Sequence, residues 1–330
     1  MSTPALVAIQ DRPSAQPTID FVLDGQPVTA FEGESILRAA ERHGVEIPRL
    51  CYSAGLRADG NCRACVVEIQ GERTLAPSCC RSVAAGMEVK AVSERALKSQ
   101  KMVLEMLLSD MPEQGYKWND SVRPGAVAGV EQASAEHGTV GQHGELSQWA
   151  AQMNVTVRPA LKALRRTQPA ADMSHPAMAV NLDACIQCTR CVRACREIQV
   201  NDVIGYALRG SHSQIVFDLG DAMGDSTCVA CGECVQACPT GALSPKTQIG
   251  SEAVDKKVDS VFPLCGVGCL LTYNVKDNTI VSVDGRDGPA NHGRLCVKGR
   301  FGFDYAHHEQ RLTTPQIRKP AVPIDPAALT

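Results

Sequence analysis

The cysteines of this chain constrain its fold more than any other feature. The 330 residues include 16 cysteines, and eight of these lie in two runs with the same spacing, C-x2-C-x2-C-x3-C. The runs are CIQCTRCVRAC at residues 185–195 and CVACGECVQACP at residues 228–239. This spacing, doubled and followed by proline, is typical of domains that hold two iron–sulfur cubes. The segment is therefore expected to fold as short loops around metal clusters.

The doubled run predicts two [4Fe-4S] clusters with crossed ligands. Two-residue spacers let three thiolates of one loop reach three irons of one cube, and the fourth cysteine of each run serves the other cube. The predicted ligands are Cys185, Cys188, Cys191 and Cys238 for one cube, and Cys195, Cys228, Cys231 and Cys234 for the other. Structural zinc, or a related fold without metal, is the alternative.

The N-terminal cysteines follow a segment typical of a β-grasp domain. Two apolar stretches flank Asp24-Gly25, a hairpin signal, and ESILRAAERHGV has helical spacing. A [2Fe-2S] site is predicted after this segment. Of two adjacent cysteines on an extended segment only one faces such a site, and we favour Cys79 over Cys80. The predicted ligands are Cys51, Cys62, Cys65 and Cys79.

Composition and charge exclude several other classes of protein. With 44% apolar residues the chain is expected to fold. The net charge is −3 and no block of lysine or arginine is present, so nucleic acid is not an expected partner. The N-terminus lacks the pattern of a signal peptide, and no apolar run approaches the roughly 20 residues that span a bilayer. We therefore expect a cytoplasmic protein without a membrane span. Its cysteines are not expected to form disulfides.

Three motifs in one order resemble a known family. They are CYSAGLRADGNCRACVVEI, the doubled run, and CGVGC with RLCVKGRFG. From about Thr18 to about Lys319 the chain resembles the N-terminal iron–sulfur part of the molybdenum- or tungsten-containing alpha subunit of cytoplasmic NAD-dependent formate dehydrogenase. That part is related to the large iron–sulfur subunit of respiratory NADH dehydrogenase. It is also related to the iron–sulfur diaphorase subunit of bidirectional hydrogenases, which would be expected to stop after the ferredoxin domain.

The resemblance implies an electron-transfer role. Electrons would pass between a bis-pterin molybdenum or tungsten site and a flavin (FMN) and NAD-binding diaphorase subunit, with a small [2Fe-2S] subunit as a further partner. In the family, the catalytic molybdenum or tungsten domains follow RLTTP, whereas this chain ends at Thr330. We therefore expect the chain alone to lack formate oxidation, and no residue is assigned a catalytic role. The alternatives are a hydrogenase diaphorase subunit and a structural docking or assembly module.

The third cysteine group departs from the family pattern. The resemblance implies a cube held by four cysteines, of which Cys265, Cys269 and Cys296 are present, and Phe262 stands at the first position. Phenylalanine has no donor atom, so a third cluster would need a substitute ligand such as Asp259, or would be a three-iron centre. Absence of a cluster is the other alternative.

Two further positions matter under this resemblance. Lys298 in CVKG corresponds to a lysine that lies between cube and pterin, which implies a cofactor-binding role, the alternative being an ordinary surface lysine. Met111 stands where related subunits carry a histidine ligand of another cluster. Because no cysteine lies between residues 80 and 185, that cluster is not expected, and His137 and His143 are predicted to be loop histidines.

The predicted fold class is α+β, in four parts. These are a β-grasp [2Fe-2S] ferredoxin domain at 18–95, a helical connector at 96–172 that corresponds to a degenerate His/Cys cluster domain, a two-[4Fe-4S] bacterial ferredoxin-like domain at 173–250, and a small β-rich N-terminal cluster domain of molybdopterin oxidoreductases at 256–313. The chain is expected to be truncated after residue 330.

Overall fold

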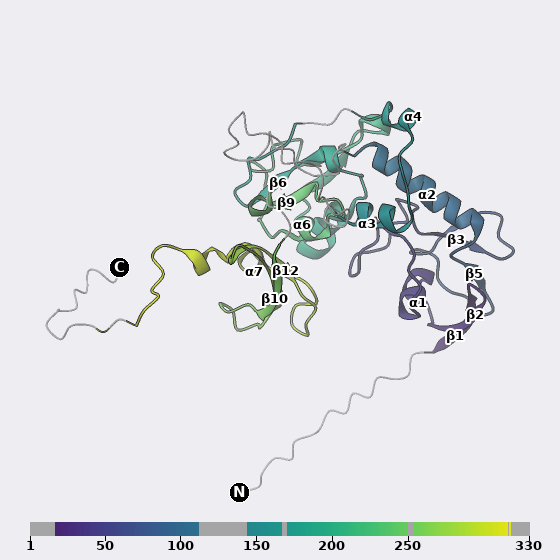
Figure 1. Ribbon diagram of the computed structural model, residues 1–330, viewed down its shortest axis with the longest axis horizontal. Helices are drawn as coiled ribbons and strands as arrows, with labels where there is room; N and C mark the ends of the chain where they lie inside the picture. The colour runs from purple at the N-terminus through teal and green to yellow at the C-terminus, as the bar shows by residue number, and fades with distance from the viewer. Residues whose placement is uncertain (1–16, 112–143, 167–169, 250–253, 316, 318–330) are drawn as a thin grey trace, which may run out of the picture. The chain divides into compact units, whose positions relative to one another are not determined.

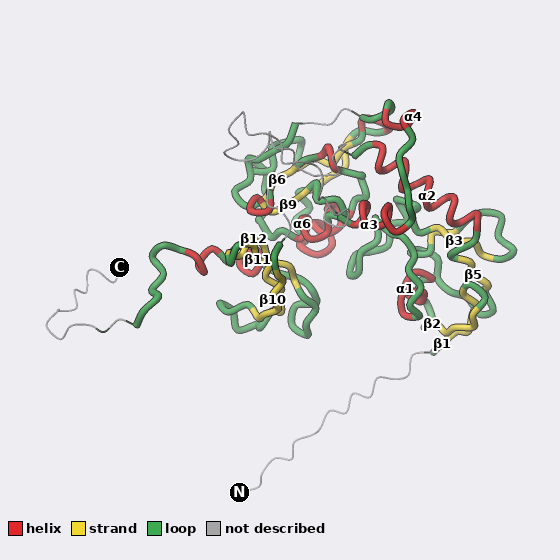
Figure 2. The backbone as a smooth tube through the Cα atoms, viewed as in Figure 1, coloured by secondary structure: helices red, strands yellow, loops and turns green. Residues whose placement is uncertain are grey.

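The computed structural model describes residues 17–111, 144–166, 170–249, 254–315 and 317. They belong to two compact units, residues 1–253 and 254–330, which are described separately (Figure 1). Figure 2 shows that loops make up much of the cysteine-rich region between the short helices and strands. Among the described residues, no helix combines the length and the apolar character needed to cross a membrane.

The first unit begins with a mixed five-stranded sheet in the order β2-β1-β5-β3-β4. Strand β1 runs antiparallel to β2 and parallel to β5, while β3 runs antiparallel to both β4 and β5. The strands are β1 (Thr18–Leu23), β2 (Gln26–Phe31), β3 (Val66–Ile69), β4 (Ala76–Pro77) and β5 (Glu88–Lys90).

The predicted hairpin and helix of this domain are confirmed. Asp24 and Gly25 both have positive φ, 48° and 82°, as the twist of a tight two-residue hairpin requires. Helix α1 (Ile36–Arg42) begins at Ser35, whose hydroxyl accepts a hydrogen bond from the Arg38 amide. Its apolar residues are fully buried in the core of the domain.

Three helices occupy the described part of the predicted connector: α2 (Glu94–Ser109), α3 (Glu145–Gln152) and α4 (Pro159–Lys162). The side chain of Gln100 is buried in α2 and donates hydrogen bonds to the carbonyls of Val66 and Ala91, which joins this helix to the first sheet. The Arg158–Glu105 ion pair, 2.7 Å long, joins the start of α4 to α2. His137 and His143 lie outside the described residues.

Two strand pairs frame the doubled cysteine run. In one pair β6 lies antiparallel to β9, which joins the beginning of the segment to its end, and β7 with β8 forms the other. The strands are β6 (Met178–Val180), β7 (Ile204–Ala207), β8 (Gln214–Phe217) and β9 (Leu243–Pro245). The helices are α5 (Arg190–Arg193), α6 (Glu233–Ala237), a π-helical turn at Ala194–Gln199, and 3-10 turns at Leu182–Ala184, Gly210–His212 and Lys246–Gln248.

The second unit is built on a three-stranded antiparallel sheet in the order β10-β11-β12. The strands are β10 (Lys256–Val261), β11 (Leu270–Lys276) and β12 (Thr279–Gly285), followed by α7 (Val297–Phe301) and a 3-10 turn at Asp304–His307. The sequence LLTYNVKDNTIVSVDG also predicts a hairpin, with its turn at residues 276–278. This prediction is confirmed, because Asp277 and Asn278 connect β11 to β12 with φ of 48° and 59°.

Candidate metal centres

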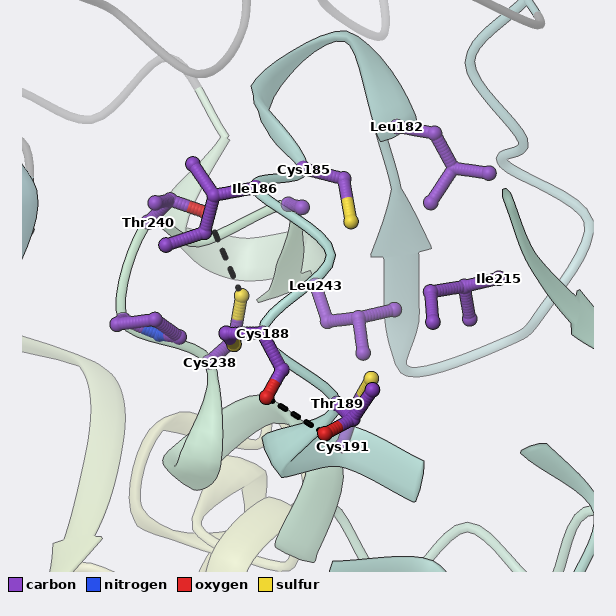
Figure 3. A pocket seen from close by; sticks show the side chains of 12 residues that line it. Leu182, Cys185, Ile186, Cys188, Thr189, Cys191, Ile215, Cys238, Thr240 and Leu243 are labelled. Carbon is purple, nitrogen blue, oxygen red and sulfur yellow. Dashed lines mark hydrogen bonds between the residues drawn. The ribbon is translucent and has the colours of Figure 1, made fainter. Parts of the chain in front are cut away.

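Four cysteines from both runs surround one cavity of the ferredoxin-like segment (Figure 3). Three come from the first run and the fourth, Cys238, comes from the end of the second, which is the grouping that crossed ligation requires. The cavity has apolar walls that include Leu182, Ile215 and Leu243. Four thiols around a compact apolar space fit a [4Fe-4S] cube. The cysteines are Cys185, Cys188, Cys191 and Cys238.

The backbone of the two runs repeats the same conformation. Gln187 and Thr189 in the first run have φ of 55° and 61°, and Ala230 and Gly232 at the equivalent positions of the second have 56° and 75°. These left-handed residues turn the chain tightly enough for amides to face thiols. The Gln187 amide donates to Sγ of Cys185 and the Ala230 amide to Sγ of Cys228, both at 3.4 Å. Such hydrogen bonds stabilise a thiolate or a reduced cluster.

Burial acts on the thiols of the first candidate cube site. It raises the pKa of Cys185 to about 11 and raises the pKa values of Cys188 and Cys191 above the ordinary range. Each of these thiols therefore keeps its proton in the absence of a cation. Because iron binds the thiolate form, cluster assembly here must release protons and replace solvation by metal coordination.

The second candidate cube site is grouped in the same way. The remaining four cysteines are Cys195, Cys228, Cys231 and Cys234. Burial raises the pKa values of Cys228 and Cys231, and the nearby Cys195 thiol of the first run raises both further. Cys195 therefore lies with the cysteines of the second run. The end of each run thus lies near leading cysteines of the other: Cys238 lines the cavity of Cys185, Cys188 and Cys191, and Cys195 lies near Cys228 and Cys231.

The predicted [2Fe-2S] ligands lie together at the edge of the first domain. Cys51, Cys65 and Cys79 are buried, and the Cys51 thiol is close enough to Cys62 and Cys79 for hydrogen bonds from these thiols to lower its pKa. Hydrogen bonding to Cys51 raises the pKa values of both neighbours. Cys80 is exposed, although its Sγ lies 3.6 Å from Sγ of Cys79. Four converging thiols fit the four ligand positions of a [2Fe-2S] cluster.

The third group of cysteines is more exposed to solvent than the other two. Cys265 and Cys296 are exposed, and Cys269 is partly buried just before β11. Phe262 is buried in the core of the second unit, and its amide donates to the carbonyl of Cys269 at 2.9 Å. The residue that replaces the first ligand is thus part of the apolar core. The core residues are Phe262, Leu271, Val283, Leu295 and Phe303.

The structure places three other predicted residues. Asp259, considered as a substitute ligand, accepts a 2.7 Å hydrogen bond from Thr272 on the neighbouring strand. Lys298 is exposed on α7, and Met111 is buried against Leu104 and Leu146 in an apolar cluster. Within the described ranges, no three histidine, cysteine, aspartate or glutamate side chains are arranged to hold a single metal ion. In an iron–sulfur cube, by contrast, each thiolate binds a different iron.

Two arginines at the sites were not identified from the sequence. Arg190 and Arg193 lie on α5, inside the first cysteine run, and both side chains are almost fully buried. Arg190 donates to the carbonyl of Leu50 and to the carboxylate of Glu145. The available signal was the contrast between the two runs, because the equivalent residues of the second run are Glu233 and Gln236.

Comparison with known proteins identifies three similar domain families. Three family models match: "2Fe-2S iron-sulfur cluster binding domain" at residues 16–94, "NADH-quinone oxidoreductase subunit 3, ferredoxin-like domain" at 175–244, and "Molybdopterin oxidoreductase Fe4S4 domain" at 255–308. The predicted α+β fold class, with its β-grasp, ferredoxin-like and cluster-binding domains, is confirmed.

Several curated proteins are similar over most of the chain. A subunit of an NADH-quinone oxidoreductase of Rhizobium meliloti is 31% identical over 309 residues, which cover 91% of this chain and 33% of that protein. The alpha subunit of an NADPH-Fe(3+) oxidoreductase of Geobacter sulfurreducens is 28% identical, with 91% and 33% covered. A Staphylococcus haemolyticus protein named as a formate dehydrogenase is 26% identical, with 90% and 32% covered. The chain thus spans about a third of the length of these relatives.

A solved structure shares the fold. An NAD+-reducing [NiFe]-hydrogenase, solved in its H2-reduced state, contains a chain that superposes with a TM-score of 0.57 at 24% identity. The superposition covers 72% of this chain and 92% of the other. At this identity the likeness concerns the fold alone.

Proposed function

We propose that this chain, which is similar to the N-terminal iron–sulfur portion of NADH-quinone oxidoreductase subunits and of formate dehydrogenase-like molybdopterin oxidoreductases, carries electrons in an NAD-dependent formate dehydrogenase. In this proposal the electrons pass between a bis-pterin molybdenum or tungsten site and a subunit that binds FMN and NAD. A small [2Fe-2S] subunit is a further proposed partner.

The observation that carries the electron-transfer proposal is a shared apolar cluster. Cys51 and Cys62 of the candidate [2Fe-2S] site lie in the same cluster as Cys185, Cys188 and Cys238 of the first candidate cube site. Two metal centres in one water-poor environment can exchange electrons without a mobile carrier. A structural role alone does not require the two ligand sets to share a core.

The residues of this chain have defined tasks in such a function. The clusters supply one-electron chemistry when bound. The cysteines hold them, the amides of Gln187 and Ala230 hydrogen-bond to ligand sulfurs, and apolar residues such as Leu182 and Leu243 exclude water. We propose the fifteen cysteines other than Cys80 as ligands, with a third cluster at Cys265, Cys269 and Cys296 as the open case.

Metal content and redox spectra test this proposal. On anaerobically purified protein, about ten irons per chain, with [2Fe-2S] and cube signals in electron paramagnetic resonance (EPR) after dithionite, are expected if the first three clusters form. About thirteen or fourteen irons would show a third cluster site in use. Iron-free protein, or protein with zinc and no reducible signal, would support the docking module instead.

The substrate is tested in the assembled complex. When the catalytic and flavin partners are present, formate should reduce the clusters of this chain, as followed by their EPR signals. Hydrogen should not reduce them. Reduction by hydrogen would favour the alternative role as a diaphorase subunit of a hydrogenase; a chain of an NAD+-reducing [NiFe]-hydrogenase shares the fold. The match to a molybdopterin oxidoreductase domain at residues 255–308 supports formate.

A further inference from the structure

A polar seam joins the loop that follows Cys51 to the first cysteine run. The amide of Arg57 donates to the Glu197 carboxylate at 3.1 Å, and the side-chain amide of Asn61 donates to the carbonyl of Gln187 at 3.2 Å. Leu56 packs against Ala194 in the same region. The loop between two candidate [2Fe-2S] ligands thus lies directly against the loop that carries three candidate cube ligands.

Arg193 occupies the centre of this seam. One terminal guanidinium nitrogen donates to the carbonyl of Cys51 at 2.5 Å and to the carbonyl of Cys188 at 3.3 Å, and the other donates to the carbonyl of Arg57. Cys51 and Cys188 are candidate ligands of two different clusters. One side chain therefore bridges the main chain of both ligand loops.

The charge of Arg193 is buried and only weakly compensated. The residue is 4% exposed, and Nε has no hydrogen-bond partner among the described residues. In the part of the chain that the structure describes, Arg193 forms an ion pair with Asp59, whose Oδ2 lies 3.9 Å from Nε and accepts a 3.0 Å hydrogen bond from Thr189. Its neighbour Arg190, by contrast, is paired with Glu145 at 2.7 Å. The buried, loosely paired positive charge between the two loops therefore belongs to Arg193.

We propose that Arg193 is a positioning residue that couples the [2Fe-2S] centre to the first cube. Its hydrogen bonds hold the two ligand loops at a fixed separation, and its charge stabilises the reduced state of both clusters. The inference rests on the proposed electron-transfer function. In that function one electron leaves the reduced cube and one enters the oxidised [2Fe-2S] cluster, with no bond or proton transferred.

The chain supplies its own comparison for this residue. Gln236 occupies the equivalent position of the second run, where it follows the same C-x2-C-x2-C pattern on α6. Glutamine is therefore compatible with the local fold of such a run. Arg193→Gln removes the charge and most of the donors while keeping a side chain of related length. Arg196→Gln is the matched control, because Arg196 is exposed and pairs with Asp202 on the surface.

The test uses the full, anaerobically purified chain with its iron and sulfide measured. A potentiometric EPR titration of Arg193→Gln should show both clusters harder to reduce. At a fixed applied potential the ratio of reduced to oxidised cluster should fall roughly tenfold, which is about 59 mV for a one-electron couple. The microwave power that half-saturates the [2Fe-2S] signal should also fall, because a looser seam weakens magnetic interaction with the reduced cube. Arg196→Gln should behave as the parent.

Arg193→Lys separates charge from geometry. Lysine keeps the charge but cannot donate to three carbonyls in the planar arrangement of a guanidinium. We expect cluster potentials near those of the parent and a lower half-saturation power. If Arg193→Gln loses iron, Arg193→Lys is the variant that tests the inference. Variants that have the iron content of the parent and match it in both measurements would overturn the inference about Arg193 and leave the proposed function unaffected. A parent chain without cluster signals would overturn the proposed function as well.

Discussion

At the residue scale, the choice between adjacent cysteines is a sharp prediction. Cys79 is buried beside the other predicted [2Fe-2S] ligands, whereas Cys80 is exposed. Cys79→Ser should therefore abolish the [2Fe-2S] EPR signal and lower the iron content by about two per chain. Cys80→Ser, the matched control, should retain both. If the control loses the signal instead, the ligand assignment is wrong.

Phe262 carries a second prediction at this scale. Its ring is buried among Leu271, Leu295 and Phe303, so Phe262→Cys leaves a cavity and should destabilise the second unit by about 2–4 kcal/mol in urea unfolding. The same change supplies a thiol at the position of the first family ligand. We expect the iron content to rise despite the loss of stability. Unchanged iron content would show that a fourth thiol is not what this site needs.

Residues differ in how far the sequence revealed their roles. The cysteines could be grouped from spacing alone, because ligand spacing is a local property of the chain. Arg193 could not be identified in this way, since its hydrogen bond to Cys51 joins residues that lie 142 positions apart. The burial of Phe262 was also hidden, because the sequence shows that a ligand is missing and not what the substituted ring packs against.

At the scale of elements, both hairpins and α1 were predictable because each has a local cause. Asp24-Gly25 and Asp277-Asn278 adopt the left-handed conformations that tight hairpins require, and the apolar spacing of α1 matches its buried face. The pairing of β6 with β9 was not predictable. It joins segments about 65 residues apart that are too short to carry a strand pattern of their own.

The turn that enters β6 should make stability depend on pH. Burial lowers the pKa of His175, Lys246 lowers it further, and Asp172 opposes the shift. Nδ1 of His175 accepts hydrogen bonds from the amides of Ala177 and Met178, which only the neutral ring can do. The folded-state pKa of His175 therefore lies below the unfolded value of about 6.5. The stability that the neutral ring contributes is fully present above that pH and is lost as pH falls toward the folded-state pKa.

Asparagine is the matched substitution for this histidine. Its side-chain oxygen can accept the same amides but does not titrate. In urea unfolding, the parent should lose more stability than His175→Asn between pH 7.5 and pH 5.5, by up to about 1 kcal/mol. Parallel losses in the two proteins would exclude His175 as the source of the pH dependence.

At the scale of the whole molecule, the two units should respond differently to removal of iron. The ferredoxin-like segment has short strands and surrounds its candidate cube sites with loops, so its folding should depend on the clusters. The second unit has a three-stranded sheet and an apolar core that includes Phe262 and Leu271. It is expected to stay folded without metal.

Hydrogen exchange read by mass spectrometry measures this difference directly. After anaerobic chelation, amides in 178–245 should lose most of their protection, whereas those of β11 and β12 should keep theirs. The parent with intact clusters is the control for both regions. Equal loss in the two units would mean that a third cluster supports the second sheet, in which case Cys265, Cys269 and Cys296 hold metal despite Phe262. Equal retention would mean that the doubled run folds on its apolar contacts alone, and the clusters would then contribute redox chemistry and little stability.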